Sequence, residues 1–235
     1  MTEKTLFSKY LKLNDVKRLI KNDVDINQKD DYGSTQLFYV EDLKIAKLLI
    51  AHGADVNIKN NFGNMPIHTT HDIKKIRLLI QHGADVNAKG SKNNTPLHNP
   101  GYSYQLAKLL IEHGANVNAR NNINTVPLHV VSDIKILCLM LKHGADVNAI
   151  DQFHFNALHY AQNLKVAIVL IKYGAVPSSI NTYKQYRLLF NQEQRTAFDA
   201  FMSLTQNRSD FFQMCLGFNQ SENFELNEIS FETDI

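Results

Sequence analysis

Apolar triplets return along the chain at nearly constant intervals, which is typical of a repeated amphipathic helix. They are Leu48–Ile50, Leu78–Ile80, Leu109–Ile111, Leu139–Leu141 and Val169–Ile171. Residues that favour a helix start precede them at one repeat position: Asp42, Asp72, Ser103, Asp133 and Asn163. Such side chains accept hydrogen bonds from the free amides of a first helical turn. The pattern predicts one helix per unit, with the triplet in the core.

A conserved spacing of whole phrases shows that these helices belong to internal repeats. HGADVN or a close variant begins at His52, His82, His113, His143 and Tyr173, and its last residues fall at steps of 30, 31, 30 and 30. Each phrase has a glycine where a helix end needs a left-handed residue without a Cβ. The chain is therefore expected to stack similar units instead of forming one globule.

A second phrase, TPLH at Thr95–His98 with MPIH at Met65–His68 and VPLH at Val126–His129, keeps the same interval. In combination with LLIxHGADVNA it resembles the ankyrin repeat, over about Leu6 to Ser178. We expect Thr95 to cap a first helix that opens at Pro96. The resemblance implies that the histidine of TPLH orients neighbouring turns by hydrogen bonding.

The units have about 30 residues, whereas a familiar ankyrin repeat has 33, and the missing residues lie between the two helices. We predict first helices of only one to two turns. The loops keep their ten residues, and residues that tolerate positive φ stand at the tips: Gly33, Gly63, Asn93, Asn124 and His154. The expected fold is all-α, an ankyrin-like solenoid of about six helix-turn-helix units with β-hairpin turns and a C-terminal helical cap.

The chain of 235 residues divides into four predicted segments. Residues 1–30 form an N-terminal capping repeat, residues 31–178 the ankyrin-like repeats, and residues 179–218 a helical cap over the last apolar face. Residues 219–235 form an acidic, disordered tail. The net charge of the chain is +2, and residues 1–218 carry +7, because the tail has five acidic side chains and no Lys or Arg. A folded-back tail, a PDZ ligand and a bacterial translocation signal are weaker readings of it.

Sequence signatures of catalysis and metal binding are missing. The histidines that recur in the repeats are expected to be architectural, and ring nitrogens one repeat apart are too distant for a shared zinc ion. A row of Lys44, Lys74, Lys135 and Lys165 is read as a solvated face, because aromatic interleaving for nucleic acid is missing. No run of about 18 apolar residues predicts a membrane span. We expect no cofactor, metal, nucleic acid or membrane partner.

The residue just before each loop tip is the strongest candidate for recognition. It is Tyr32, Phe62, Lys92, Ile123 or Phe153, and four of these five are apolar or aromatic. A line of such side chains along one edge is a candidate protein-binding stripe, although each ring could instead pack on its neighbouring hairpin. The irregular turn HNPGYS adds Tyr102 and Tyr104, as a partner contact or as a tolerated insertion.

These features favour a non-catalytic interaction module or scaffold, monomeric and cytoplasmic, with a protein as its partner. The alternative is an effector in which the repeats direct the protein to its target and residues 179–235 carry a separate activity. A bacterial effector would reach the cytoplasm of a host cell by translocation. That segment lacks a paired nucleophile and base, which makes the alternative weaker.

Overall fold

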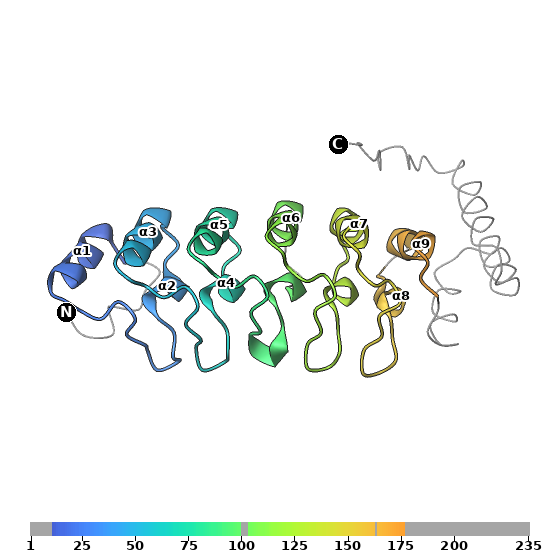
Figure 1. Cartoon of the computed structure of the whole chain (residues 1–235), viewed down its shortest axis with the longest axis horizontal. Coiled ribbons are helices and arrows are strands. Elements are labelled where there is room, and N and C mark those ends of the chain that lie inside the picture. The colour runs from blue at the N-terminus through green and yellow to red at the C-terminus, as the bar shows by residue number, and fades with distance from the viewer. Residues whose placement is uncertain (1–10, 100–102, 163, 177–235) are drawn as a thin grey trace, which may run out of the picture.

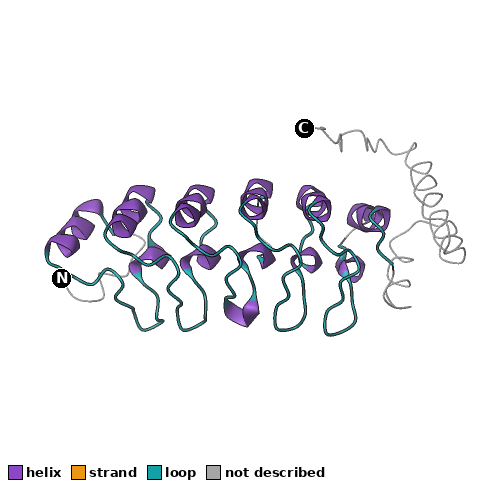
Figure 2. Cartoon of the chain, viewed as in Figure 1, coloured by secondary structure: helices purple, strands orange, loops and turns teal. Residues whose placement is uncertain are grey.

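The chain folds into a row of helical units, in a computed structural model that describes residues 11–99, 103–162 and 164–176. Figure 1 shows one layer of outer helices, a second layer of short helices, and loops that project away from the outer layer. Coloured by secondary structure, the described part of the chain shows helices and loops without strands (Figure 2). The all-α prediction is confirmed for these residues.

The outer layer consists of nine-residue helices: α1 (Leu13–Lys21), α3 (Leu43–Ala51), α5 (Ile73–Gln81), α6 (Tyr104–Glu112), α7 (Ile134–Lys142) and α9 (Leu164–Lys172). Side chains of Asp42, Asp72, Ser103 and Asp133 accept from amides of the first turn, as predicted. The predicted cap at Asn163 falls outside the described residues.

The second layer holds single helical turns: α2 (Gln36–Tyr39), α4 (Pro66–Thr69), η3 (Pro96–His98), η4 (Pro127–His129) and α8 (Ala157–Tyr160). They confirm the expectation of short first helices. Thr95 takes the predicted N-cap position, with Pro96 as the first helical residue, and it forms a capping box with His98. Its hydroxyl oxygen lies 2.9 Å from His98 Nδ1, and that nitrogen accepts from the Thr95 amide at 3.1 Å.

The core lies between the two helical layers and continues from unit to unit. Ile76, Leu79, Leu110 and Leu137 are each 0% exposed. The glycine after each outer helix from α3 to α9 has the predicted left-handed conformation, as at Gly53 with φ +89°, and Asp23 takes this place after α1. In α3, α5, α6 and α7 the histidine before the glycine closes the helix end, since its Nδ1 lies 2.8 to 2.9 Å from the carbonyl oxygen four residues earlier.

Several predictions fall on parts of the chain outside the described residues. The C-terminal cap, the acidic tail and residues 1–10 of the N-terminal capping unit lie there, and so do residues 100–102 of the irregular turn. The loops carry turns at their tips, and the structure assigns no strand to them in the described ranges. None of the helices described is long and apolar enough to cross a membrane.

Candidate interaction surface at the loop tips

The bases of neighbouring loops are joined by a ladder of asparagine side chains. The Asn57 amide nitrogen donates to the Gly83 carbonyl at 2.8 Å, and its oxygen accepts from the Asp85 amide at 3.0 Å. The same pair of contacts is made by Asn27, Asn87, Asn118 and Asn148. Each asparagine therefore bridges two consecutive units, a role that the fixed spacing of these residues could have revealed.

Histidine side chains of the short helices also join neighbouring units, by hydrogen bonds to the backbone of the following loop. The ring of His68 accepts from the Met65 amide through Nδ1 and donates from Nε2 to the Ala88 carbonyl of the next unit at 2.9 Å. His98 and His129 reach Thr125 and Ala149. Because Nδ1 of each ring accepts a hydrogen bond from a backbone amide, these rings are neutral, and burial lowers the pKa of all three.

The first residue of four tips shapes the turn that follows. The side-chain oxygen of Asn60 accepts from the amides of Phe62 and Asn64, both at 3.0 Å. Asp30, Asn121 and Asp151 make the equivalent two contacts. Such an Asx turn fixes the backbone on both sides of the residue that precedes the positive-φ position.

The tip stripe, defined as Tyr32, Phe62, Lys92, Ile123 and Phe153, lies on these turns. Tyr32 is 61% exposed, Phe62 60%, Phe153 57% and Ile123 39%. The rings of Tyr32 and Phe62 are also stacked, with centroids 6.5 Å apart. The rings of this pair therefore pack on each other, as one interpretation of the stripe expects, and they also keep most of their surface in solvent.

Backbone contacts link the stripe from tip to tip. The amide of Asn61 donates to the Tyr32 carbonyl at 2.9 Å, and the amides of Asn122 and Gln152 donate to Lys92 and Ile123 at 3.1 and 3.0 Å. The backbone that carries the stripe is therefore fixed by hydrogen bonds between neighbouring loops. Such a pre-organised surface would lose less conformational entropy on binding.

The third tip differs, because Gly90 stands where the others have Asp or Asn. It lacks the side-chain acceptor, and the segment Ser91–Asn93 forms a 3₁₀ turn, η2, in which Lys92 has φ +56°. A Cβ on Gly90 would lie 2.5 Å from Asn64 Oδ1 and 2.7 Å from His68 Cδ2. Asn64 from the preceding loop accepts instead from the Ser91 amide at 2.8 Å.

Of the two tyrosines predicted at the irregular turn, Tyr104 is the one that the structure describes, and it does not join the stripe. Tyr104 begins α6, is half-buried and packs against the hydrophobic core. Tyr102 lies outside the described residues. At the last described loop the half-buried ring of Phe155 lies beside that of Phe153, with centroids 6.4 Å apart.

A second row of cations, which the sequence reasoning missed, runs three residues before the stripe. It comprises Lys29, Lys59, Lys89 and Arg120, all exposed, and we call it the cation row. Lys29 Nζ donates to the Lys59 carbonyl at 3.1 Å, and Arg120 Nη1 donates to the carbonyls of Asn124 and Ile150 at 3.1 and 2.7 Å. The row thus lies along the loops and reaches the tip at Asn124.

Lys75 is a second residue that sequence reasoning missed. It lies on α5, is 3% exposed, and its ammonium donates to the Val40 carbonyl at 2.7 Å beyond the end of α2. Burial lowers the pKa of Lys75 to about 8, although the charges of Asp72 and Glu41 oppose that shift. Its repeat position carries Ile45, Leu106, Ile136 or Val166 in other units, and this phase was the available signal.

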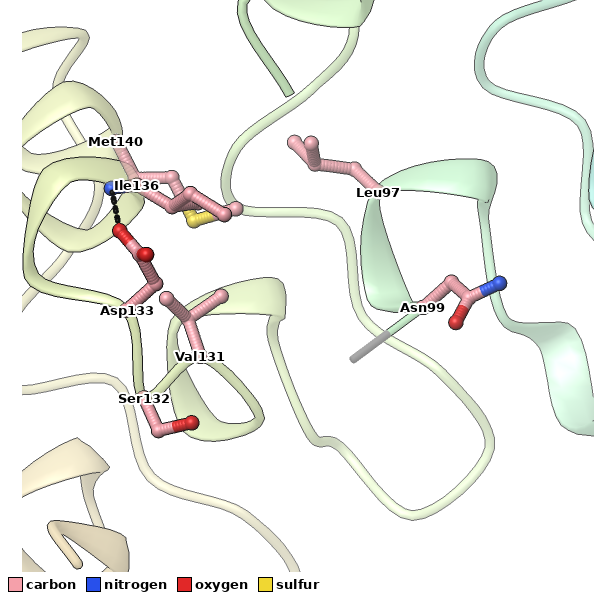
Figure 3. Close-up of a pocket in the computed structure, with 7 residues that line it drawn as sticks. All are labelled: Leu97, Asn99, Val131, Ser132, Asp133, Ile136 and Met140. Carbon is pink, nitrogen blue, oxygen red and sulfur yellow. Dashed lines mark hydrogen bonds between the residues drawn. The ribbon is translucent and has the colours of Figure 1, made fainter. Parts of the chain in front are cut away.

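A small pocket opens between η3 and α7, with a volume of about 50 Å³. Figure 3 shows Leu97 facing Ile136 and Met140 across it; Asn99, Val131, Ser132 and Asp133 complete the lining. The Asp133 carboxylate is engaged by the Ile136 amide at 3.0 Å, so it acts as a helix cap. Within the described ranges, no group of three or more His, Cys, Asp or Glu residues is placed to hold a metal ion.

Comparison with known proteins identifies the repeats. Residues 38–121 match the family model described as ankyrin repeats (3 copies). The matched stretch includes α3, α5 and α6, and the two loop tips that carry Phe62 and Lys92 lie within it. No curated protein matches the chain.

Proposed function

Because the chain is an ankyrin repeat protein, we propose that it is a non-catalytic interaction module whose protein partner binds the tip stripe. The observation that carries the proposal is the exposure of Tyr32 and Phe62, at 61% and 60%, on tips fixed by hydrogen bonds. Large aromatic side chains on a rigid surface are common anchors of protein interfaces, since they bury much apolar area at a small entropy loss.

The finer architecture belongs to the same proposal. We infer about six units, with α1 as the outer helix of the first, loops of hairpin type, and a C-terminal helical cap at residues 179–218. The regular spacing of the repeats supports the count, and the need to cover the last apolar face supports the cap. The module would act as a monomer, with each unit adding one tip to the binding edge.

The test is affinity capture with the full chain from cell lysates. One bait is the natural sequence, and the second has Tyr32, Phe62, Ile123 and Phe153 replaced by Ala. A matched control replaces Lys44, Lys74, Arg77 and Lys135 on the outer helices by Ala. Circular dichroism first establishes that all three baits are folded.

A protein retained by the natural chain and the outer-helix control, and lost by the tip variant, is the expected result. Equal retention by all three baits would place the interaction elsewhere and contradict the proposal. Loss by the outer-helix control with retention by the tip variant would move the binding surface to the opposite layer.

A further inference from the structure

The tip stripe and the cation row together define which partner would fit. Apolar side chains occupy both ends of the stripe, at Tyr32 and Phe62 and again at Ile123 and Phe153, and Lys92 stands between the two pairs. The cation row follows on the first four of these loops, three residues before the stripe position, and Ile150 takes the equivalent place before Phe153. Within the described chain, this edge presents apolar surface in two patches, each bordered by positive charge.

The spacing of the tips restricts the conformation of a partner that contacts several of them. Neighbouring units repeat at about the packing distance of their helices, roughly 8 to 10 Å. An α-helix returns to the same face every turn of about 5.4 Å, and a β-strand every second residue, about 7 Å. A polyproline II helix has three residues per turn and a rise of about 3.1 Å, so it returns about every 9 Å.

Of these periods, that of the polyproline II helix comes nearest to the repeat distance of the units, so it can place one side chain opposite each successive tip. The exposed rings of Tyr32 and Phe62 approach each other more closely, with centroids 6.5 Å apart. Every third residue of such a segment would face the stripe, and a neighbouring edge of the same left-handed helix would face the cation row. Flat aromatic surfaces are also the usual platform for polyproline II ligands, which lose little entropy on binding. The stacked pair of Tyr32 and Phe62 provides such a surface.

We propose that the tip edge binds an acidic protein segment in the polyproline II conformation, with apolar side chains at every third position and an acidic residue opposite Lys92. This inference rests on the proposed function and adds the chemistry of the partner. Carboxylates of the segment face Lys59, Lys89 and Lys92, while its apolar side chains contact the aromatic tips. The complementary charge sets the register, because an apolar residue opposite Lys92 would leave the ammonium without a partner.

The experiment measures fluorescence polarisation of labelled peptides with the full chain. The probe peptide is LPELPEEPELPEL, which has Leu or the central Glu at every third position. A second peptide, LPKLPKKPKLPKL, keeps the spacing and reverses the charge. A third, LLPEPEEEPEPLL, keeps the composition of the probe and removes the three-residue period.

The natural chain is expected to bind the probe at least about tenfold more tightly than either control peptide, and the preference should weaken at high salt. Lys92→Asn removes the charge with a residue that tolerates the positive φ, and Lys92→Glu reverses it. Both should lower affinity for the probe, and the reversal should raise affinity for the lysine peptide. Lys44→Glu, on the outer face of α3, makes the same charge change away from the tips and should have no effect.

Equal binding of the acidic and basic peptides would overturn the charge assignment, and equal binding of the third peptide would overturn the three-residue period. If no peptide binds while capture through the tip stripe succeeds, the partner chemistry is wrong and the proposed function stands. If tip-stripe substitutions affect neither capture nor peptide binding, both fail.

Discussion

Neighbouring units are joined by polar contacts in the loop layer and by apolar packing in the layer of outer helices. In the loops, Asn57 and His68 each reach backbone groups of the following unit, at distances of 2.8 to 3.0 Å. In the helices, the joint consists of fully buried side chains such as Ile76 and Leu79. Polar contacts fix position and direction, whereas apolar burial supplies most of the free energy of stacking.

Each layer also contains one residue whose chemistry differs from that of its equivalents in the other units, and these two residues lie close in sequence. Lys75 places an ammonium in the apolar layer, and Gly90 removes the acceptor side chain that other tips use. These two residues indicate that a regular repeat tolerates a local exception when the adjacent unit supplies the hydrogen-bond partner that would otherwise be missing. Val40 supplies the carbonyl for Lys75, and Asn64 supplies the acceptor at Gly90.

The largest effect is expected from breaking the apolar joint. Ile76→Ala should lower the free energy of unfolding by about 2–4 kcal/mol, because the residue is fully buried and the cavity would refill only in part. Asn57→Ala, in the polar joint of the same units, should cost about 1 kcal/mol. Urea denaturation of both variants measures the difference. Equal losses would contradict the division of roles between the layers.

Removing the exception in the helix layer should stabilise the protein. Lys75→Met is expected to raise the free energy of unfolding at pH 7 by roughly 1–3 kcal/mol, because a pKa unit corresponds to about 1.4 kcal/mol and burial lowers the pKa of Lys75 from 10.5 to about 8. The folded pKa lies below the unfolded one, so the destabilisation is complete below pH 8 and disappears as the pH rises to 10.5.

Denaturation of Lys75→Met and the natural chain between pH 7 and 10.5 checks this dependence. Lys74→Met, at the neighbouring exposed position, is the control and should change stability little. A gain that stays constant across the pH range would show that Lys75 does not titrate in the folded protein as its burial requires.

Adding a single methyl group at Gly90 should destabilise the third tip, which is the exception in the loop layer. Gly90→Ala is expected to lower the free energy of unfolding by about 1–3 kcal/mol, because its Cβ would approach Asn64 and the ring of His68 within 3 Å. Ser91→Ala keeps the amide that Asn64 binds and serves as the control. Thermal melting compares the two variants, and similar melting temperatures would mean that the third tip adapts freely.

Local signals in the sequence were sufficient to predict most of the fold. Asp72 as an N-cap, Gly83 after the helix and Asn124 at a tip each depend on the chemistry of one residue and its neighbours in sequence, and all three were predicted. The exposure of Tyr32 and Phe62 also followed from their place before a tip. Tyr104 was predicted from the irregular turn instead, and it packs on the core.

The features that were not predicted depend on contacts between units, which the sequence of a single repeat does not encode. Lys75 looks like the second residue of an exposed lysine pair until α5 is aligned with the other outer helices and with the end of α2. The restriction at Gly90 comes from Asn64 and His68 of the preceding unit. The cation row was visible in the repeat phase, but its relation to the tips required the contacts of Arg120.

The polar joint should weaken in mild acid. Because burial lowers the pKa of His68, His98 and His129 below 6.5, the unfolded chain takes up protons first as the pH falls. Stability is therefore fully present above about pH 6.5 and is lost as the pH falls toward the folded pKa values. NMR titration of the three rings, with denaturation at pH 8 and pH 5, checks this; ring pKa values at or above 6.5 would contradict it.

The smallest effect is expected at the residue that makes the third tip unusual. Lys92 has φ +56°, a region that disfavours side chains with a Cβ, so Lys92→Gly should raise the free energy of unfolding by about 0.5–1 kcal/mol. Asn124→Gly, at φ +58° in the next tip, should gain less, because asparagine already tolerates that conformation. Urea denaturation resolves the pair, and an equal gain at both sites would show that the strain belongs to tips in general. A gain at Lys92 together with weaker binding of the acidic probe would mean that the lysine is held in a strained conformation at the position where its charge contacts the partner.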